Sequence, residues 1–168
     1  MRTAFLFIVI LALSISAAAQ QQLTVGTEAP AFSAEYLNGK PLELNDLKGK
    51  VVVMTFWSTR CLICHNEIPK LNRMADSYKG RDVVFLALTM ENESVVNPYI
   101  KKNPFRFDIV PNSFGVVLKY ADTDASGRIR MGFPSYYLID RKGKINLRAD
   151  GWDKTSNIDT RIAQLLSE

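Results

Sequence analysis

The chain has 168 residues, of which 47% are hydrophobic and 23% are charged, and its formal net charge is +4. This composition is typical of a globular protein, and the length is enough for one compact core but not for two ordinary domains. The positive charge is mild, and no basic run is interleaved with aromatic residues, which argues against nucleic acid as a partner.

Residues 1–19 have the pattern of a targeting signal. Arg2 supplies the positive start, residues 4–15 form an apolar core, and three alanines end it at Ala19. We therefore predict a signal peptide over 1–19 and a single domain over 20–168 that is periplasmic or secreted. The apolar core is shorter than the ~20 residues that a membrane-spanning helix needs. An uncleaved membrane anchor is the alternative, and it leaves the domain outside the cytoplasm as well.

The first elements of the domain are predicted to be β-structure. Residues 23–47 indicate an N-terminal hairpin, because Asn38 and Gly39 form a two-residue turn signal in which both residues can adopt positive φ. The run over 51–57 is apolar on both faces and rich in β-branched and aromatic residues. Such a run is typical of a central strand in a sheet that is covered on both sides.

A helix is predicted to follow Cys61, and Lys79 and Gly80 end it. Its apolar stripe consists of Ile63, Ile68, Leu71, Met74 and Ala75. Residues 82–89 predict a second buried strand. A strand, a helix and a strand of this combined length imply a right-handed crossover between two parallel strands.

The next part of the chain gives weaker signals. Residues 94–102 predict a short helix that ends before Pro104, and 106–110 are a candidate edge strand. Residues 114–120 are ambiguous between a helix and a loop.

The C-terminal third predicts a hairpin and a helix. Residues 135–140 are a strand, 141–143 a turn and 144–148 the returning strand. A helix follows from about Ser156, with Ser156 and Asp159 as a capping pair. Its apolar face consists of Ile158, Ile162, Leu165 and Leu166. The order β-α-β followed by β-β-α is a thioredoxin-type arrangement, with helices for both faces of one sheet.

The only two cysteines, Cys61 and Cys64, are three positions apart. A structural disulfide this short would close too small a loop to stabilise the fold much. Cys61 lies instead where a buried strand meets a helix, and free N–H groups and the helix dipole favour an anion there. This placement lowers the pKa of the thiol and activates the thiolate for disulfide exchange, and Arg60 adds positive charge. Cys64, one turn further, can release whatever Cys61 captures.

The segment FWSTRCLICHNEIPKLN resembles the active-site region of the TlpA/ResA-like thioredoxin family. That region has the pattern F-W-x-x-x-C-x-x-C-x-x-E-x-P, and its places are filled here by Phe56, Trp57, Cys61, Cys64, Glu67 and Pro69. The stretch GFPSYYLID over 132–140 is similar to the family's G-x-P-T-x-x-L-I-D strand, and the stretch from Gly26 to Lys50 also fits.

The resemblance implies an α/β thioredoxin fold, a central mixed sheet flanked by helices, with an N-terminal β-hairpin extension. It also implies an extracytoplasmic thiol-disulfide oxidoreductase, a reductase rather than an oxidant. It needs no metal and no cofactor besides the redox-active disulfide itself. A membrane electron donor would supply the electrons, and exported thiol or disulfide proteins, including apocytochrome c, would receive them.

The resemblance assigns roles to individual residues. Cys61 would attack, Cys64 would resolve the mixed disulfide, and Pro134, in a cis peptide, would shape the docking groove. The backbone of Phe133 would then pair with an extended substrate segment. Trp57 and Arg60 complete the predicted substrate-binding residues, although core packing also explains Trp57.

Several positions depart from the family pattern. Arg60 stands where the family usually has Trp, and residues 62–63 are Leu-Ile in place of the common proline-containing dipeptides. Thr55 stands where cytoplasmic thioredoxins carry a buried Asp, so proton transfer must use another group. Glu67 is the candidate, and water is the alternative.

Four other interpretations compete with this one. CLICH has the spacing of a c-type haem attachment motif, but it lies between two strongly β-type runs. A peroxidase of the peroxiredoxin type would need Pro and Thr before the attacking cysteine, and only Ser58 partly matches. A zinc site would lack ligands, since the chain has two Cys and one His. A binding module without turnover would not need both cysteines and Pro134. His65, the single histidine, could support the Cys61 thiolate or lie on the solvated helix surface.

Overall fold

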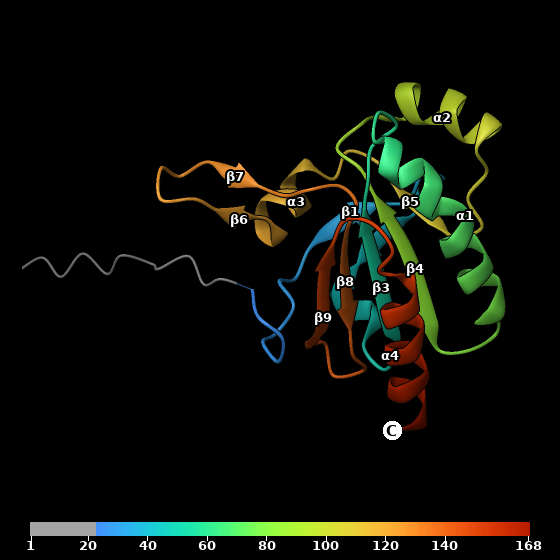
Figure 1. The fold of residues 1–168 in the computed structure, drawn as a ribbon, viewed down its shortest axis with the longest axis vertical. Coiled ribbons are helices and arrows are strands. Elements are labelled where there is room, and N and C mark those ends of the chain that lie inside the picture. Colours follow the sequence, from blue (N-terminus) through green and yellow to red (C-terminus); the bar gives the residue numbers. More distant parts are fainter. Residues whose placement is uncertain (1–22) are drawn as a thin grey trace, which may run out of the picture.

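The protein is described by a computed structural model that covers residues 23–168, so the predicted signal peptide lies outside the described residues. A five-stranded mixed sheet forms the centre of the domain, in the order β5-β4-β3-β8-β9 (Figure 1). Its strands are β3 (Val51–Phe56), β4 (Val83–Leu88), β5 (Asp108–Val110), β8 (Ser135–Ile139) and β9 (Ile145–Asp150). The sheet is flanked by the helices α1 (Leu62–Ser77), α2 (Glu93–Lys102), α3 (Phe114–Tyr120) and α4 (Thr155–Ser167). This is the predicted thioredoxin fold.

Strand pairing brings the functionally important loops to one end of the sheet. β3 and β4 run parallel with Phe56 opposite Leu88, and β4 and β5 are parallel as well. β8 runs antiparallel to β3 and begins at Ser135, which lies opposite Phe56. β9 ends at Asp150, which is the partner of Ser135. The segments after β3, β4 and β9 and the segment before β8 therefore meet at the same edge.

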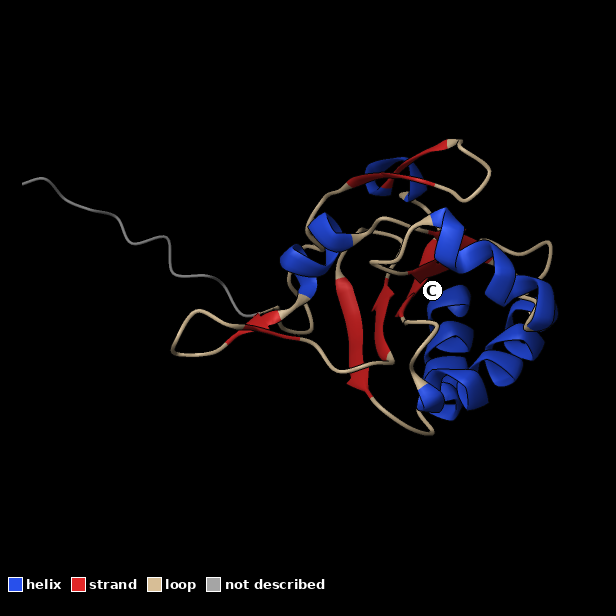
Figure 2. Ribbon diagram, turned by 90° about the horizontal axis from the view of Figure 1, so that it is seen from above, coloured by secondary structure: helices blue, strands red, loops and turns tan. Residues whose placement is uncertain are grey.

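The two faces of the sheet have separate cores. On one face, alternate strand residues such as Tyr136 of β8 pack against the two helices α1 and α4. The helices contribute Leu71 and Met74 from α1 and Ile158 and Ile162 from α4. On the other face, Phe32, Leu42, Val116, Val117 and Tyr120 pack against Met54, Phe56, Leu86 and Tyr137. The second set comes from the N-terminal hairpin and α3. Figure 2 shows the longer helices gathered on one side of the sheet.

The predicted N-terminal hairpin is confirmed, but its turn differs. β1 (Ser33–Glu35) pairs antiparallel with β2 (Pro41–Glu43). The loop between them closes with a hydrogen bond from Tyr36 N–H to the Lys40 carbonyl, N···O 2.9 Å. Of the two predicted turn residues, Asn38 and Gly39, only Gly39 has a positive φ, of 77°. The connection is therefore longer than the predicted two-residue turn. A short 3-10 helix, η1 (Leu44–Leu47), follows it.

Two details of the predicted helices are wrong. Ile63 was expected in the buried stripe of α1, but it is 41% exposed, because the buried face runs through Cys64, Glu67 and Ile68 instead. α4 begins at Thr155 and has no side-chain cap, so the Ser156–Asp159 capping pair does not form. Asp159 instead accepts a hydrogen bond from the Tyr78 hydroxyl, O···O 2.9 Å.

A further hairpin was not predicted. β6 (Asp122–Thr123) and β7 (Ile129–Arg130) form an antiparallel pair that projects from the domain (Figure 1). Arg148 on β9 forms an ion pair with Asp122 at the base of this hairpin. Among the described residues, none of the helices is long and apolar enough to cross a membrane.

Candidate active site

The two cysteines lie between the end of β3 and the first turn of α1. Cys61 is the residue that caps α1, and its Sγ accepts a hydrogen bond from the Cys64 N–H, N···S 3.1 Å. The two sulfurs form a disulfide, with 5.2 Å between the Cα atoms. The first turn of α1 carries no acidic residue. The unpaired N–H groups and the dipole of this helix end therefore favour negative charge on Cys61 when the disulfide is reduced.

The two sulfurs differ in accessibility. Cys61 is half-buried, whereas Cys64 is only 1% exposed. A sulfur on another protein can therefore reach Cys61, while Cys64 can react only with Cys61. The surface around Cys61 consists of exposed Arg60 and of Leu62 and Ile63, which are 74% and 41% exposed. Arg60 is thus exposed next to Cys61 in the sequence, and two exposed apolar side chains follow Cys61.

The loop before Cys61 is held from two sides. Glu91, which follows β4, accepts hydrogen bonds from the Thr59 N–H and hydroxyl, both at 2.8 Å, and from the Ser58 hydroxyl at 3.1 Å. His65 Nε2 lies 2.9 Å from the Thr59 carbonyl oxygen, and its ring packs against Tyr99 with 5.1 Å between centroids. Both backbone groups of Thr59 are therefore bound. The sequence left two roles open for His65, support of the Cys61 thiolate or a place on the solvated helix surface. In the structure its ring contacts the backbone of the loop instead.

The peptide bond between Phe133 and Pro134 is cis, as the resemblance implied. Pro134 is buried at the start of β8, and its carbonyl accepts a hydrogen bond from the Gly151 N–H, N···O 2.8 Å. Phe133 is half-buried against the apolar cluster that contains Trp57 and Cys64. Within residues 23–168, the backbone N–H and carbonyl of Phe133 have no backbone partner. The chain beside the cysteines therefore has free backbone groups to offer an extended segment.

Glu67 is on the buried face of α1, one turn after Cys64. Its carboxylate is fully buried, with Oε1 2.9 Å from Lys70 Nζ and Oε2 without a hydrogen-bond partner among the described residues. Burial raises the pKa of Tyr136 well above its ordinary value, and the negative charge of Glu67 raises it further. Thr55 lies opposite Tyr136 in the sheet and on the same face. Glu67 therefore lies near Tyr136 on this face of the sheet, three residues after Cys64 on α1.

Trp57 does not reach the surface, in contrast to its predicted place among the substrate-binding residues. It is 1% exposed and packs against Phe105 and Tyr99, with ring centroids 4.6 and 5.3 Å away. The side chain directly follows the buried strand β3, whose alternation turns it toward α1 and α2. Its role is core packing beside the site, the other explanation that the sequence allowed.

Three of the four alternative functions can be compared with this geometry: haem attachment, a peroxidase motif and a zinc site. Attachment of c-type haem uses two cysteine sulfurs and a histidine, but here the sulfurs are bonded to each other and His65 is bound to Thr59. Ser58, the partial match to a peroxidase motif, donates its hydroxyl to Glu91. Within residues 23–168, no three or more His, Cys, Asp or Glu side chains cluster as metal ligands would.

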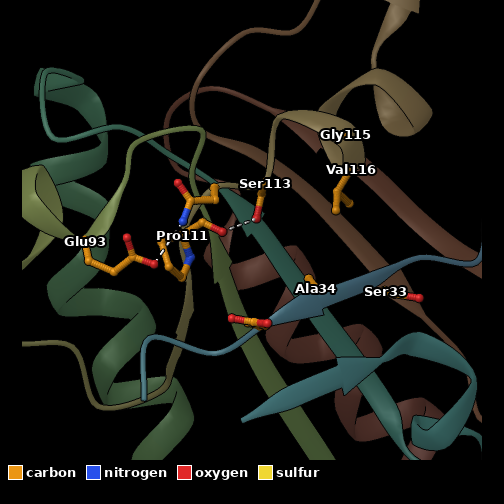
Figure 3. A pocket seen from close by; sticks show the side chains of 9 residues that line it. Ser33, Ala34, Glu93, Pro111, Ser113, Gly115 and Val116 are labelled. Atoms are coloured by element: carbon orange, nitrogen blue, oxygen red, sulfur yellow. Dashed lines mark hydrogen bonds between the residues drawn. The ribbon is translucent and has the colours of Figure 1, made fainter. Parts of the chain in front are cut away.

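A surface cavity of about 350 Å³ lies away from the cysteines, between β1 and the loop that precedes α3 (Figure 3). Glu93 and Asn112 meet in its wall, where Asn112 Nδ2 donates to Glu93 Oε1 at 2.9 Å. None of the lining residues is a cysteine.

Comparison with known proteins identifies the family of this chain. Residues 25–148 match the family model described as the AhpC/TSA family. The thiol-disulfide oxidoreductase ResA of Bacillus thuringiensis is 33% identical over 127 residues, which are 75% of this chain and 69% of that protein. ResA of Bacillus subtilis is 31% identical over 150 residues, which are 86% of this chain and 80% of that protein.

Solved structures show the same fold. The thioredoxin domain of a thiol-disulfide oxidoreductase from Bacteroides vulgatus superimposes with a TM-score of 0.69 at 26% identity, over 83% of this chain and 97% of that one. A thiol:disulfide interchange protein of the thioredoxin family from Chlorobium tepidum gives a TM-score of 0.71 at 24% identity, over 83% and 96%. The chain belongs to the AhpC/TSA family of thioredoxin-fold proteins, and it is a thiol-disulfide oxidoreductase of the type that the ResA proteins represent.

Proposed function

We propose that this chain reduces disulfide bonds of exported proteins by cycling Cys61 and Cys64 between dithiol and disulfide. One observation carries the proposal. The half-buried residue Cys61 lies at the N-terminus of α1, its sulfur is bonded to that of buried Cys64, and it packs against the same apolar cluster as Phe133. In this arrangement the Cys61 sulfur can form the bond to the substrate protein, and the Cys64 sulfur can then break that bond.

The cycle begins with both cysteines reduced. The Cys61 thiolate attacks one sulfur of the substrate disulfide, a bond forms between Cys61 and that sulfur, and the second substrate sulfur leaves and takes up a proton. Cys64 then gives its proton to a base and attacks Cys61. The bond between Cys61 and the substrate breaks, and the departing substrate sulfur takes up a proton. The substrate has gained two electrons and two protons, and the chain has become the disulfide.

Glu67 is the base that we propose for Cys64. Residues three apart on a helix have Cβ atoms roughly 5–6 Å from each other, so the Glu67 carboxylate can reach the Cys64 thiol directly or through one water. Pro134 and Phe133 would receive the substrate segment beside Cys61, and Arg60 would contact it at the surface. Thr55 occupies the position of the buried Asp of cytoplasmic thioredoxins, but a threonine hydroxyl cannot act as the base. The proton of the Cys64 thiol therefore needs another acceptor, and we propose Glu67.

Location and partners follow from the sequence and the relatives together. Residues 1–19 have the signal-peptide pattern, so the domain would act in the periplasm or outside the cell. The relatives named ResA are thiol-disulfide oxidoreductases. The reducing direction is what the resemblance to the TlpA/ResA-like family implies. A membrane donor would regenerate the dithiol. Exported proteins with oxidised thiols, apocytochrome c among them, would be the substrates.

A redox titration of the Cys61–Cys64 pair tests the direction of electron flow. Thioredoxin-fold proteins span roughly −270 mV for thioredoxin to −120 mV for a strong oxidant. We expect a potential below about −220 mV in glutathione or dithiothreitol buffers, read by alkylation of the free thiols and mass spectrometry. A value near −120 mV would make the chain an oxidant and overturn the proposal.

A further inference from the structure

Glu67 is a carboxylate with no access to solvent, and an isolated buried carboxylate strongly favours its neutral form. A protonated Glu67 could not accept the proton of Cys64. The groups that face it therefore decide whether it works as a base. On its own helix, Lys70 is an ion-pair partner, and on β8 Tyr136 is a neutral phenol whose pKa burial raises. Among the described residues, Lys70 is the one cation that contacts Glu67.

Lys70 is held in place by more than Glu67. Its Nζ lies 3.3 Å from Asp153 Oδ1 and 4.7 Å from the centre of the Trp152 ring. Both residues belong to the loop after β9, in which Asp153 has a φ of 59° and the Gly151 N–H donates to the Pro134 carbonyl. The ammonium therefore lies between the buried carboxylate and the loop beside the cis-proline. Hydrogen bonds to Glu67 and Asp153 raise the pKa of Lys70, so it stays charged.

We infer that Lys70 is a positioning residue for disulfide exchange, which keeps Glu67 ionised so that Glu67 can take the proton of Cys64. The inference rests on the proposed function and deepens it, because it adds the group that makes the base available. The TlpA/ResA-like pattern that this chain resembles specifies Glu67 and Pro69 but not the next position, which is Lys70 here.

The proton step balances without any added reactant. Cys64–SH and the Glu67 carboxylate become Cys64–S⁻ and the Glu67 carboxylic acid. The Cys64 thiolate then forms the bond to Cys61 and displaces the substrate thiolate. That leaving group takes the proton from Glu67, which returns to the carboxylate beside Lys70. The ammonium of Lys70 keeps its own protons throughout.

The test separates the two sulfur reactions. The reduced protein is mixed with one equivalent of an aromatic disulfide that releases a coloured thiol. The first release reports the attack of Cys61, and the second reports the attack of Cys64 on the mixed disulfide. The rate of the second release is measured against pH for the wild type and for Lys70→Met, Lys70→Gln and Lys70→Arg. Lys102→Met is the matched control, because Lys102 is exposed at the end of α2.

We expect the acid limb of the second-release profile to move to higher pH in Lys70→Met and Lys70→Gln. Removing the positive charge beside a buried carboxylate favours its neutral form, so the second release should slow by about tenfold or more at about pH 6. Lys70→Arg retains the charge and should restore the wild-type limb, and Lys102→Met should leave it unchanged. Lys70→Gln retains a hydrogen-bond donor, so it gives a result even where Lys70→Met folds poorly.

The outcomes that overturn the inference are distinct from those that overturn the function. The inference fails if the acid side of the pH profile is unchanged in both Lys70→Met and Lys70→Gln. It also fails if the second release is slower by the same factor at every pH, because Lys70 would then have only a structural role. Lys70→Met should add nothing in a Glu67→Gln background. If Glu67→Gln alone has a wild-type profile, Glu67 is not the base, although two releases per chain would still support disulfide exchange.

Discussion

Replacing Cys64 with Ser is expected to convert the protein into a trap that stays covalently bound to its substrates. A serine hydroxyl at this position cannot attack the mixed disulfide at neutral pH, whereas Cys61 keeps its place at the start of α1. The chain has no third cysteine, so in a reaction without added thiol nothing in the protein releases the captured substrate. The adduct with a disulfide substrate such as insulin should therefore rise from a transient species to nearly one per chain. Non-reducing gels and intact mass measure it directly.

Cys61→Ser is the matched control for this trap. It removes the accessible sulfur, so no adduct should form, and turnover with insulin should fall by at least about 10³-fold, as for other catalytic nucleophiles. Far-UV circular dichroism confirms that both variants are folded. If Cys61→Ser formed adducts and Cys64→Ser did not, the assignment of the attacking and resolving sulfurs would be reversed.

Trp57→Ala is expected to destabilise the domain more than any surface change. The indole is 1% exposed, and it packs between Phe105 and Tyr99 in the cluster that also contains Cys64. Truncating a buried Trp to Ala costs about 3–5 kcal/mol of the free energy of unfolding. Since a domain of this kind is stable by about 5–15 kcal/mol, the loss is a large part of the total. Urea unfolding followed by circular dichroism measures it.

Trp152→Ala is the control, because the chain has only two tryptophans and this one is 52% exposed. Its removal should lower the free energy of unfolding by at most about 1 kcal/mol, because it loses a partly exposed contact with the Lys70 ammonium and no core packing. Similar losses for the two variants would show that Trp57 is not the core residue that its burial indicates.

The sheet could be predicted because its strands carry strong local signals. β3 and β4 are continuous apolar runs, β8 and β9 are joined by a short turn at Gly143, and α1 follows a strand directly. These patterns gave the strand order along the chain and hence the thioredoxin arrangement. The assignment of 114–120 stayed open because seven residues are too few to show a helical period.

The errors lie where local signals are weak or where distant contacts decide. The β6–β7 hairpin has two residues per strand, too few for an alternation pattern, and an ion pair with Arg148 on β9 supports its base. The start of α4 lies one residue before Ser156, so the Ser156 side chain falls inside the helix. Ile63 was placed in the buried stripe by its hydrophobicity alone, although it lies on the exposed first turn of α1.

The residues of the candidate active site also fall into those that the sequence indicates and those that only the structure reveals. Cys61, Cys64, Glu67 and Pro134 are recognisable because they lie in two short motifs. Lys70 and Glu91 could not be found from the sequence, since their roles depend on contacts made in the folded chain. Glu91 binds Thr59 from a position 32 residues away, and Lys70 contacts Asp153 from 83 residues away. A charged residue in a motif-free position gives no sign of such partners.

The central claim is that the start of α1 makes Cys61 an accessible, reactive thiolate while Cys64 is shielded. Alkylation of the reduced, folded protein with iodoacetamide across a range of pH, with each cysteine followed by peptide mass spectrometry, tests it most directly. We expect Cys61 to react half-maximally at a pH well below the value of about 8.5 for a free cysteine, and Cys64 to stay largely unmodified. A Cys61 that reacts only at or above that pH, or a Cys64 that reacts first, would contradict the account.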